Sequence, residues 1–522
     1  MSLRTTCYSL ALGAALFAAA TAHAAPDAVK LYQVQCASCH GVDRLGITGP
    51  ALLPESLKRL RRKKAVSVID KGRAATQMPA FGEVLGEAEI TALIDYIYSP
   101  PAVSPRWTQQ DIEHSRIVST AKADPAAQPV FKADPLNLFV VVESGDHHVT
   151  ILDGDTFEPI HRFKSRYALH GGPKFSRDGR YVYFASRDGW VTKYDLYTLT
   201  TIAEVRAGIN TRNIALSRDS DYVAVANYLP HTLVLLNAAD LSIARIMEVT
   251  DKEGASSRVS AVYQSPTRNS FIAALKDIPE IWEIATDPNA PPVYTGLVHS
   301  HEKGMVEALA ADSGLFALRR IEVESPIDDF FFDQTYRHLI GSSRDGTHGV
   351  VVNLNVGLPI AQIDLPGLPH LGSGITWRYK GRPVMATPHL REARLSVIDM
   401  TDWSVLKTIE TKGPGFFMRS HETTPYAWTD VFFGPNRDLL HVIDKRTLEI
   451  VRTLRPEPGK TAAHVEFTRN GSHALVSIWD MDGALVVYDA KTLEEVKRIP
   501  MVKPSGKYNV YNKITFSAGT SH

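Results

Sequence analysis

The segment "CASCHG", Cys36 to Gly41, places two thiols and an imidazole close together in the chain. Two cysteines separated by two residues and followed by a histidine form the C-x-x-C-H pattern of c-type haem attachment. In that pattern the thiols bond covalently to the vinyl groups of a porphyrin, and the histidine binds its iron from one face. Cys36, Cys39 and His40 are therefore predicted to hold one covalent haem c.

The opposite face of this iron needs a second ligand, and the segment "ATQMPAFG" supplies Met78. A histidine–methionine ligand pair raises the reduction potential of a haem, which suits the transfer of single electrons. The alternative is a redox-active dithiol beside a chance histidine, with Met78 filling a hydrophobic core as methionine commonly does.

Local patterns indicate the helices that would position these ligands. "DAVKLYQVQCASCHG" predicts a helix with the attachment site at its end, and "LGEAEITALIDYIYS" predicts an amphipathic closing helix. Together with Gly49-Pro50 and "MPAF", these parts resemble a class I cytochrome c. The resemblance implies a small all-α cytochrome c domain over residues 25–100, which the proline-rich segment "YSPPAVSPRW" ends.

Further along the chain, three histidines lie beside glycines or directly before predicted strands: His170 in "YALHGGPKFSRDG", His370 in "LPHLGSGITW" and His464 in "TAAHVEFTRNG". Arg212 and Lys276 are cations in comparable positions. An imidazole can bind iron or accept a proton near neutral pH, and a cation can bind a carboxylate. Taken singly, each of the five is more commonly a structural residue, so the residues alone leave their role open.

The elements that must position these side chains form a repeat. An apolar strand, a polar turn and a second strand recur along the chain, and the second strand of each copy ends near an anchor residue: Asp153, Asp195, Asn237, about Glu283, Asn353, Asp399, Asp444 and Asp489. Most steps between anchors are 42 to 46 residues, which is typical of a β-propeller. The longer step from 283 to 353 predicts an insertion in one blade. We therefore predict an all-β eight-bladed β-propeller over residues 108–522, with seven blades as the alternative.

The N-terminus has the pattern of an export signal. Residues 1–24 combine one arginine, a short apolar stretch and an Ala-His-Ala ending. Because the apolar run is shorter than the ~20 residues needed to span a membrane, we expect cleavage and a soluble protein in the periplasm, with retention as an anchor as the alternative. The formal net charge of +0 gives no indication of a nucleic-acid partner or an anionic membrane surface.

The order of these parts resembles the haem d1 family of cytochrome cd1 nitrite reductases over nearly the whole chain after the leader. Local matches include the segment around His170, the Pro369-His370-x-Gly loop, "TPHLREARLSVID" and the closing "GKYNVYNKITF". The resemblance implies a propeller that holds haem d1, with His170 as the proximal iron ligand. It also implies that His370 is one of the two distal histidines that protonate nitrite.

Two departures point away from nitrite reduction. The second distal histidine falls in "SPIDDFFFDQTYRHL", where Phe331 or a neighbour takes its position, and a phenyl ring cannot donate the proton that the reaction consumes. The reductases also carry an N-terminal arm before the c domain, whereas here about eleven residues separate the predicted cleavage site from Cys36. Both departures resemble the paralogous dihydro-haem d1 dehydrogenases of the NirN type, in which His464 would be a distal ligand of the d1 iron.

This resemblance implies an oxidoreductase of haem d1 biosynthesis that dehydrogenates a propionate of dihydro-haem d1 to the acrylate of haem d1. It implies that His370 is the catalytic base, that Arg212 and Lys276 bind carboxylates of the macrocycle, and that electrons pass through haem c to a soluble periplasmic acceptor. A cytochrome cd1 nitrite reductase that receives haem d1 is a further expected partner. The alternatives are an NO-forming nitrite reductase, a non-catalytic haem d1 carrier, and a propeller that carries haem c for electron transfer only.

Overall fold

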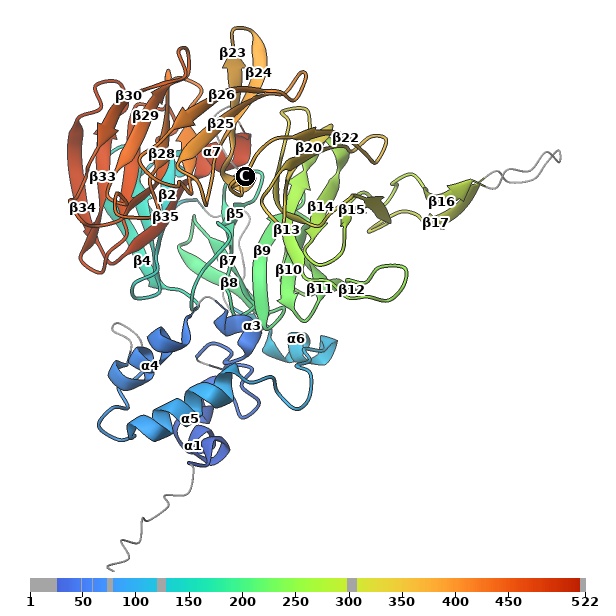
Figure 1. Cartoon of the computed structure of the whole chain (residues 1–522), viewed down its shortest axis with the longest axis vertical. Coiled ribbons are helices and arrows are strands. Elements are labelled where there is room, and N and C mark those ends of the chain that lie inside the picture. The colour runs from blue at the N-terminus through green and yellow to red at the C-terminus, as the bar shows by residue number, and fades with distance from the viewer. Residues whose placement is uncertain are drawn as a thin grey trace, which may run out of the picture.

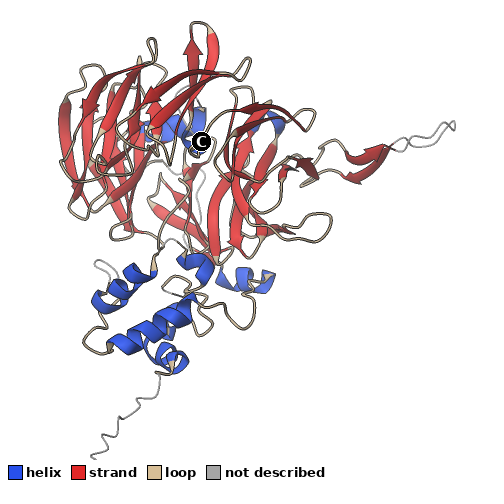
Figure 2. Cartoon of the chain, viewed as in Figure 1, coloured by secondary structure: helices blue, strands red, loops and turns tan. Residues whose placement is uncertain are grey.

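The computed structural model describes residues 26–47, 49–58, 60–72, 78–119, 128–297 and 308–516. The leader expected over residues 1–24 lies outside these ranges. Helices make up the N-terminal part of the chain and strands form most of the remainder (Figure 1, Figure 2). In the part described, no helix is long and apolar enough to cross a membrane.

Short helices surround a small hydrophobic core in the N-terminal part; in chain order they are α1 (Ala28–Gln35), α2 (Ala37–His40), α3 (Pro54–Leu57), α4 (Arg62–Lys71) and α5 (Glu87–Tyr98). The Asp27 side chain begins α1 by accepting the N–H of Lys30. In α5 the buried side chains recur at helical spacing, from Ile90 through Leu93 and Ile94 to Ile97. Both helices that the sequence predicts around the attachment site are therefore confirmed.

In the described part of the chain, the strands beyond these helices form eight antiparallel sheets of four or five strands, the predicted blades, and one two-stranded sheet. First strands of neighbouring blades contact one another, so they line the axis. From the axis outward, the first four blades are: blade 1, β35 (Pro504–Asn509), β2 (Leu138–Glu143), β3 (His148–Asp153), β4 (Pro159–Lys164); blade 2, β5 (Lys174–Phe175), β6 (Tyr181–Ala185), β7 (Trp190–Asp195), β8 (Thr200–Arg206), β1 (Ile117–Val118); blade 3, β9 (Asn210–Leu216), β10 (Tyr222–Leu229), β11 (Thr232–Asn237), β12 (Ile243–Glu248); blade 4, β13 (Val259–Ser265), β14 (Ser270–Leu275), β15 (Glu280–Ala285), β18 (Leu318–Glu322).

The other four follow in chain order: blade 5, β19 (Ile327–Phe332), β20 (His338–Ser343), β21 (Gly349–Asn353), β22 (Leu358–Ile363); blade 6, β23 (Ile375–Tyr379), β24 (Arg382–Pro388), β25 (Arg394–Asp399), β26 (Val405–Glu410); blade 7, β27 (Met418–Ser420), β28 (Tyr426–Asp430), β29 (Leu440–Asp444), β30 (Glu449–Leu454); blade 8, β31 (Ala462–Phe467), β32 (His473–Ile478), β33 (Gly483–Asp489), β34 (Glu495–Met501). Blade 1 closes the ring because its first strand is β35, from the end of the chain, which pairs with β2. Helix α7 (Val510–Thr515) follows β35 directly.

The predicted insertion is a hairpin in blade 4. Strands β16 (Val293–Leu297) and β17 (Ala308–Asp312) pair with each other between β15 and β18. Figure 1 shows this hairpin extending away from the ring. It accounts for the long step between the anchors Glu283 and Asn353.

The anchor residues other than Glu283, which lies within β15, recur because each begins the same turn between the third and fourth strands of a blade. In most blades the residue four positions after the anchor is left-handed and donates its N–H to the carbonyl of the anchor, as Trp403 does to Asp399 and Leu448 does to Asp444, both at 2.8 Å. The anchor side chain accepts a further N–H, for example that of Thr401 at 2.8 Å. An Asp or Asn at this position therefore stabilises the turn.

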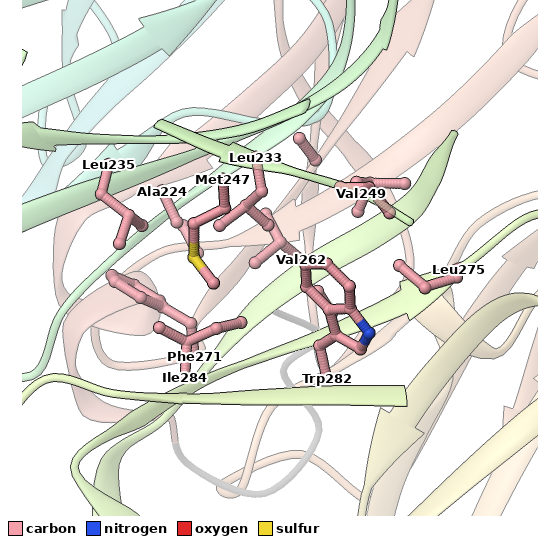
Figure 3. Packing of buried hydrophobic residues seen from close by; sticks show 14 of the residues in the cluster. Ala224, Leu233, Leu235, Met247, Val249, Val262, Phe271, Leu275, Trp282 and Ile284 are labelled. Carbon is pink, nitrogen blue, oxygen red and sulfur yellow. The ribbon is translucent and has the colours of Figure 1, made fainter. Parts of the chain in front are cut away.

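Hydrophobic side chains fill the space between neighbouring blades. Between blades 3 and 4, Leu235 and Met247 lie opposite Phe271 and Trp282 (Figure 3). All four are at most 7 % exposed. Because each such burial contributes about 1.5–3 kcal/mol, the contacts between blades stabilise the ring and hold the first strands in register around the axis.

Candidate active site

The C-x-x-C-H segment provides ligand atoms that fit a covalent haem. Cys36 and Cys39 are half-buried thiols without a disulfide. The ring of His40 is buried and its Nδ1 lies 2.8 Å from the carbonyl oxygen of Pro50. Because a carbonyl only accepts, Nδ1 carries the proton and Nε2 keeps the lone pair that iron needs.

The surroundings of the thiols argue against the redox-dithiol alternative. Burial and the neighbouring Cys39 raise the pKa of Cys36 to about 11. A redox-active dithiol needs the opposite shift, because the thiolate is its reactive form. Met78 lies in the described segment that follows α4, and its backbone approaches Gly72, where a Cβ would lie 2.8 Å from the Met78 oxygen. Its role as the second axial ligand stays a prediction.

The helical part lies against one rim of the propeller, where β8 ends and β9 begins (Figure 1). Arg206, at the end of β8, donates to the carbonyl oxygens of Leu45 and Gly46 at 2.5 and 3.0 Å. Ala51 belongs to the same hydrophobic cluster as Ile209, the residue before β9. The attachment site and this rim are therefore adjacent.

His170 precedes β5 on this rim. Its Nδ1 lies 2.9 Å from the carbonyl oxygen of Arg212, so Nδ1 donates and Nε2 bears the lone pair. The guanidinium of Arg187 lies 2.6 Å from this Nε2. Arg187 belongs to the turn between β6 and β7 and was not among the residues predicted from the sequence.

His370 precedes β23 and is held in the same manner. Its Nδ1 lies 2.7 Å from the carbonyl oxygen of Phe416, and its Nε2 lies 3.6 Å from an oxygen of Asp329. The Asp329 carboxylate also accepts from the Tyr263 hydroxyl at 3.1 Å and from the N–H of Gly372 at 3.0 Å. Burial lowers the pKa of His370 and Asp329 opposes this shift, so the ring is neutral near pH 7 with Nε2 available to accept a proton.

Two cations, Lys276 and Arg212, lie near the carboxylates of Asp328 and Asp329. Lys276 forms an ion pair with Asp328, and its ammonium lies 5.6 Å from the ring centre of Tyr228. Burial disfavours the charge on Arg212, but Tyr228 and Asp329 outweigh this effect and hold its pKa above the usual value. Arg212 is therefore charged, and both cations lie beside acids that an anionic ligand would displace.

His464 has three unusual features. Its backbone is left-handed, with φ of 53°, and the pairing of β31 with β32 shifts register between Ala463 and Glu466. Its ring is buried, and Nδ1 has no hydrogen-bond partner among the described residues. Burial lowers the pKa of His464 well below the usual value, so the ring is neutral. Strain and an unpaired buried nitrogen are both typical of a functional side chain.

Contacts join the three histidines around the axis. The Phe416 ring lies 4.3 Å from that of His370, Phe417 lies 4.8 Å from His464, and the two phenylalanines lie 4.5 Å apart, all measured between ring centres. His464 in turn lies 5.0 Å from Tyr508. A Cβ at Gly172, two residues after His170, would lie 3.3 Å from the Tyr508 ring. The three histidines and the two phenylalanines lie at or near the starts of first strands, so they share one rim, and Tyr508, near the end of β35, contacts this rim through His464.

Other histidines and aromatic residues of the propeller have structural roles. Both ring nitrogens of His389 and of His421 lie within hydrogen-bond distance of neighbouring chain segments. Trp377 is buried in the hydrophobic cluster between blades 6 and 7. Phe331 also lies in a hydrophobic cluster. The side chains of β19 that reach the candidate site are therefore those of Asp328 and Asp329. The sequence analysis missed these acids because a strand start carries no local signal for them.

Known protein families match both the helical part and the propeller. The family model "Cytochrome D1 heme domain" matches residues 133–513, and "Cytochrome C oxidase, cbb3-type, subunit III" matches residues 23–97. A dihydro-heme d1 dehydrogenase of Pseudomonas aeruginosa is 56% identical over 98% of this chain and 99% of the relative. A nitrite reductase of Stutzerimonas stutzeri is 25% identical over 92% of each chain. The solved structure "Dihydro-heme d1 dehydrogenase NirN in complex with DHE" matches with a TM-score of 0.86 and 55% identity, covering 93% of this chain and 99% of that chain.

Proposed function

The chain belongs to the dihydro-haem d1 dehydrogenases, c-type cytochromes of haem d1 biosynthesis, and we propose that it converts a propionate of dihydro-haem d1 to the acrylate of haem d1 on the rim described above. The observation that carries this proposal is the run of ring contacts that links His370 to His464 and Tyr508, with His170 two residues before Gly172 beside Tyr508, next to the attached cytochrome part. The substrate binds without a covalent bond, whereas Cys36 and Cys39 hold one haem c covalently.

Cations and aromatic rings bind the substrate. Arg212 and Lys276 hold carboxylates of the macrocycle, and the raised pKa of Arg212 and the ion pair of Lys276 with Asp328 support this role. Tyr508, between His464 and Gly172, offers a ring face to the macrocycle.

Two imidazoles bind the iron of the substrate. His170 presents Nε2 once Arg187 moves away, since its Nδ1 stays bonded to Arg212. His464 is the distal ligand, and its unpaired nitrogen supports that assignment. With both axial positions filled by protein, nitrite has no open coordination site.

His370 is the base. Forming the double bond removes two hydrogens from adjacent carbons, as two protons and two electrons. The neutral imidazole accepts one proton at Nε2, the other proton passes to solvent, and the two electrons leave one at a time to haem c. Phe416 holds the opposite nitrogen, so the ring keeps the correct tautomer. Asp329 stabilises the imidazolium that results.

Cys36 and Cys39 would hold haem c covalently, His40 and Met78 would bind its iron, and the group would accept electrons one at a time. The contacts of Arg206 with Leu45 and Gly46 keep this part beside the rim. We propose that electrons leave to a soluble acceptor in the periplasm, where the leader directs the chain, and that a cytochrome cd1 nitrite reductase receives the finished haem d1.

A titration tests this function. Oxidised protein is mixed anaerobically with dihydro-haem d1, and both chromophores are followed by absorption. Since the substrate gives up two electrons and each chain holds one haem c, we expect two equivalents of haem c to be reduced per substrate converted. Binding without conversion would support the carrier instead, and nitrite turnover with an artificial donor would support the reductase.

A further inference from the structure

We propose that Asp430 is a positioning residue that fixes the positions of both His370 and His464, although it belongs to neither of their strands. Asp430 ends β28, the second strand of blade 7, and is 1 % exposed. This inference rests on the proposed function, because it assigns a role to the two histidines of the same site.

One carboxylate oxygen of Asp430 holds the loop before β27. Oδ1 accepts the N–H groups of Phe416 and Phe417, at 2.7 and 3.1 Å. The carbonyl oxygen of Phe416 is the acceptor for Nδ1 of His370, at 2.7 Å. The position and tautomer of His370 therefore depend on a loop that Asp430 fixes.

The other oxygen holds the strained residue of blade 8. Oδ2 accepts the N–H of His464 at 3.4 Å, where the left-handed backbone turns this group out of the strand pairing. Burial raises the pKa of Asp430 to about 7 while the three N–H groups lower it. The bonding needs only oxygen lone pairs, so it does not depend on which protonation state prevails.

Two substitutions separate the contacts of Oδ1 with Phe416 and Phe417 from the contact of Oδ2 with His464; together these contacts are called the Asp430 clamp. In Asp430→Asn the amide oxygen can still accept from Phe416 and Phe417, but the amide nitrogen is a donor facing the donor of His464. In Asp430→Ala both halves are lost. Each variant is loaded with dihydro-haem d1, and the spin state of the substrate iron is read by electron paramagnetic resonance besides turnover.

The references are His464→Ala for the spin state and His370→Ala for turnover. We expect Asp430→Asn to show the spin state of His464→Ala while its turnover stays within about threefold of the wild type. Asp430→Ala is expected to show that spin state and also the turnover loss of His370→Ala, on the order of 100-fold. A wild-type spin state in Asp430→Asn, or wild-type turnover in Asp430→Ala, overturns the proposal.

Glu143→Gln is the matched control. Glu143 also ends the second strand of its blade and accepts the N–H of Val502, ahead of the first strand, at 2.9 Å, without a link to either histidine. It should keep the wild-type spin state and turnover. If Asp430→Ala does not fold, Asp430→Asn decides on spin state alone. If His464→Ala itself leaves the spin state unchanged, the ligand assignment of the proposed function fails, and the clamp is judged on whether Asp430→Ala matches His370→Ala in turnover.

Discussion

His170 and His370 occupy the same position of the blade repeat, half a turn apart around the propeller axis. Each follows a left-handed residue by two positions, Ala168 and Leu368, and each donates its backbone N–H across to the second strand of its blade at 2.8 Å. Their blades, the second and the sixth, are four steps apart in a ring of eight. The repeat thus delivers two equivalent imidazoles to opposite sides of one axis.

Although the two histidines are equivalent in the repeat, their proposed roles differ, so replacing each with alanine should impair a different property of the protein. His370→Ala should keep the affinity for dihydro-haem d1 but lower turnover about 100-fold or more, because a general base contributes that much. His170→Ala should change the spectrum of the bound substrate, because it removes an iron ligand. Absorption titration and single-turnover assays distinguish them, with His338→Ala, whose ring is held by Asp333, as the control. Equal effects of both substitutions on turnover and spectrum would contradict the division of roles.

Lys276→Met should weaken substrate binding roughly tenfold with little change in maximal turnover, because a charge-assisted bond to a carboxylate is worth ~1.5 kcal/mol. The dissociation constant is measured by titrating haem-c-loaded protein with dihydro-haem d1. Lys252→Met is the control, because Lys252 forms only an exposed ion pair with Glu322. Unchanged affinity in Lys276→Met would exclude Lys276 as a carboxylate ligand.

Gly49→Ala should disturb the ligation of haem c. A Cβ at Gly49 would lie 2.7 Å from Cε1 of His40, so the ring must move. We expect a changed visible spectrum and a shifted midpoint potential of haem c. Gly86→Ala is the matched control in the same part of the chain, because the nearest atom to its Cβ would be 3.8 Å away. An unaltered spectrum in Gly49→Ala would mean that His40 does not bind the iron in this orientation.

The stability of the propeller should fall between pH 6.5 and 4 because of His441. This residue of β29 is 1 % exposed, accepts the N–H of Lys412 at Nε2, and has its pKa lowered to about 4 by burial and by the Lys412 charge. Since the folded pKa lies below the unfolded one, the unfolded chain binds the proton first, and stability is lost as the pH falls through this window. The full shift corresponds to about 3 kcal/mol.

Chemical denaturation at pH 7 and pH 4.5 measures this loss. His441→Gln keeps an acceptor for Lys412 but cannot be protonated, so it should lose less stability than the wild type over the same interval. An identical pH dependence of the two proteins would assign the acid sensitivity to other groups.

The repeat was predictable because its signal is periodic. The anchor turn recurs in almost every blade, so errors in single copies did not alter the count, and the hairpin of blade 4 appeared as a long step. The C-x-x-C-H segment was predictable because its ligands are contiguous. Asp329, Arg187 and Asp430 were not, because each is one polar residue in an otherwise ordinary strand or turn, and only the closing of the ring brings them to the histidines.

The pairing of β35 with β2 also sets an order of assembly. Tyr508 lies on β35, so nearly the whole chain must be synthesised before Tyr508 can pack against His464. The thiols of Cys36 and Cys39, by contrast, emerge at the beginning of synthesis. Covalent haem insertion can therefore precede completion of the tetrapyrrole pocket, and a truncated chain would yield a cytochrome without a dehydrogenase.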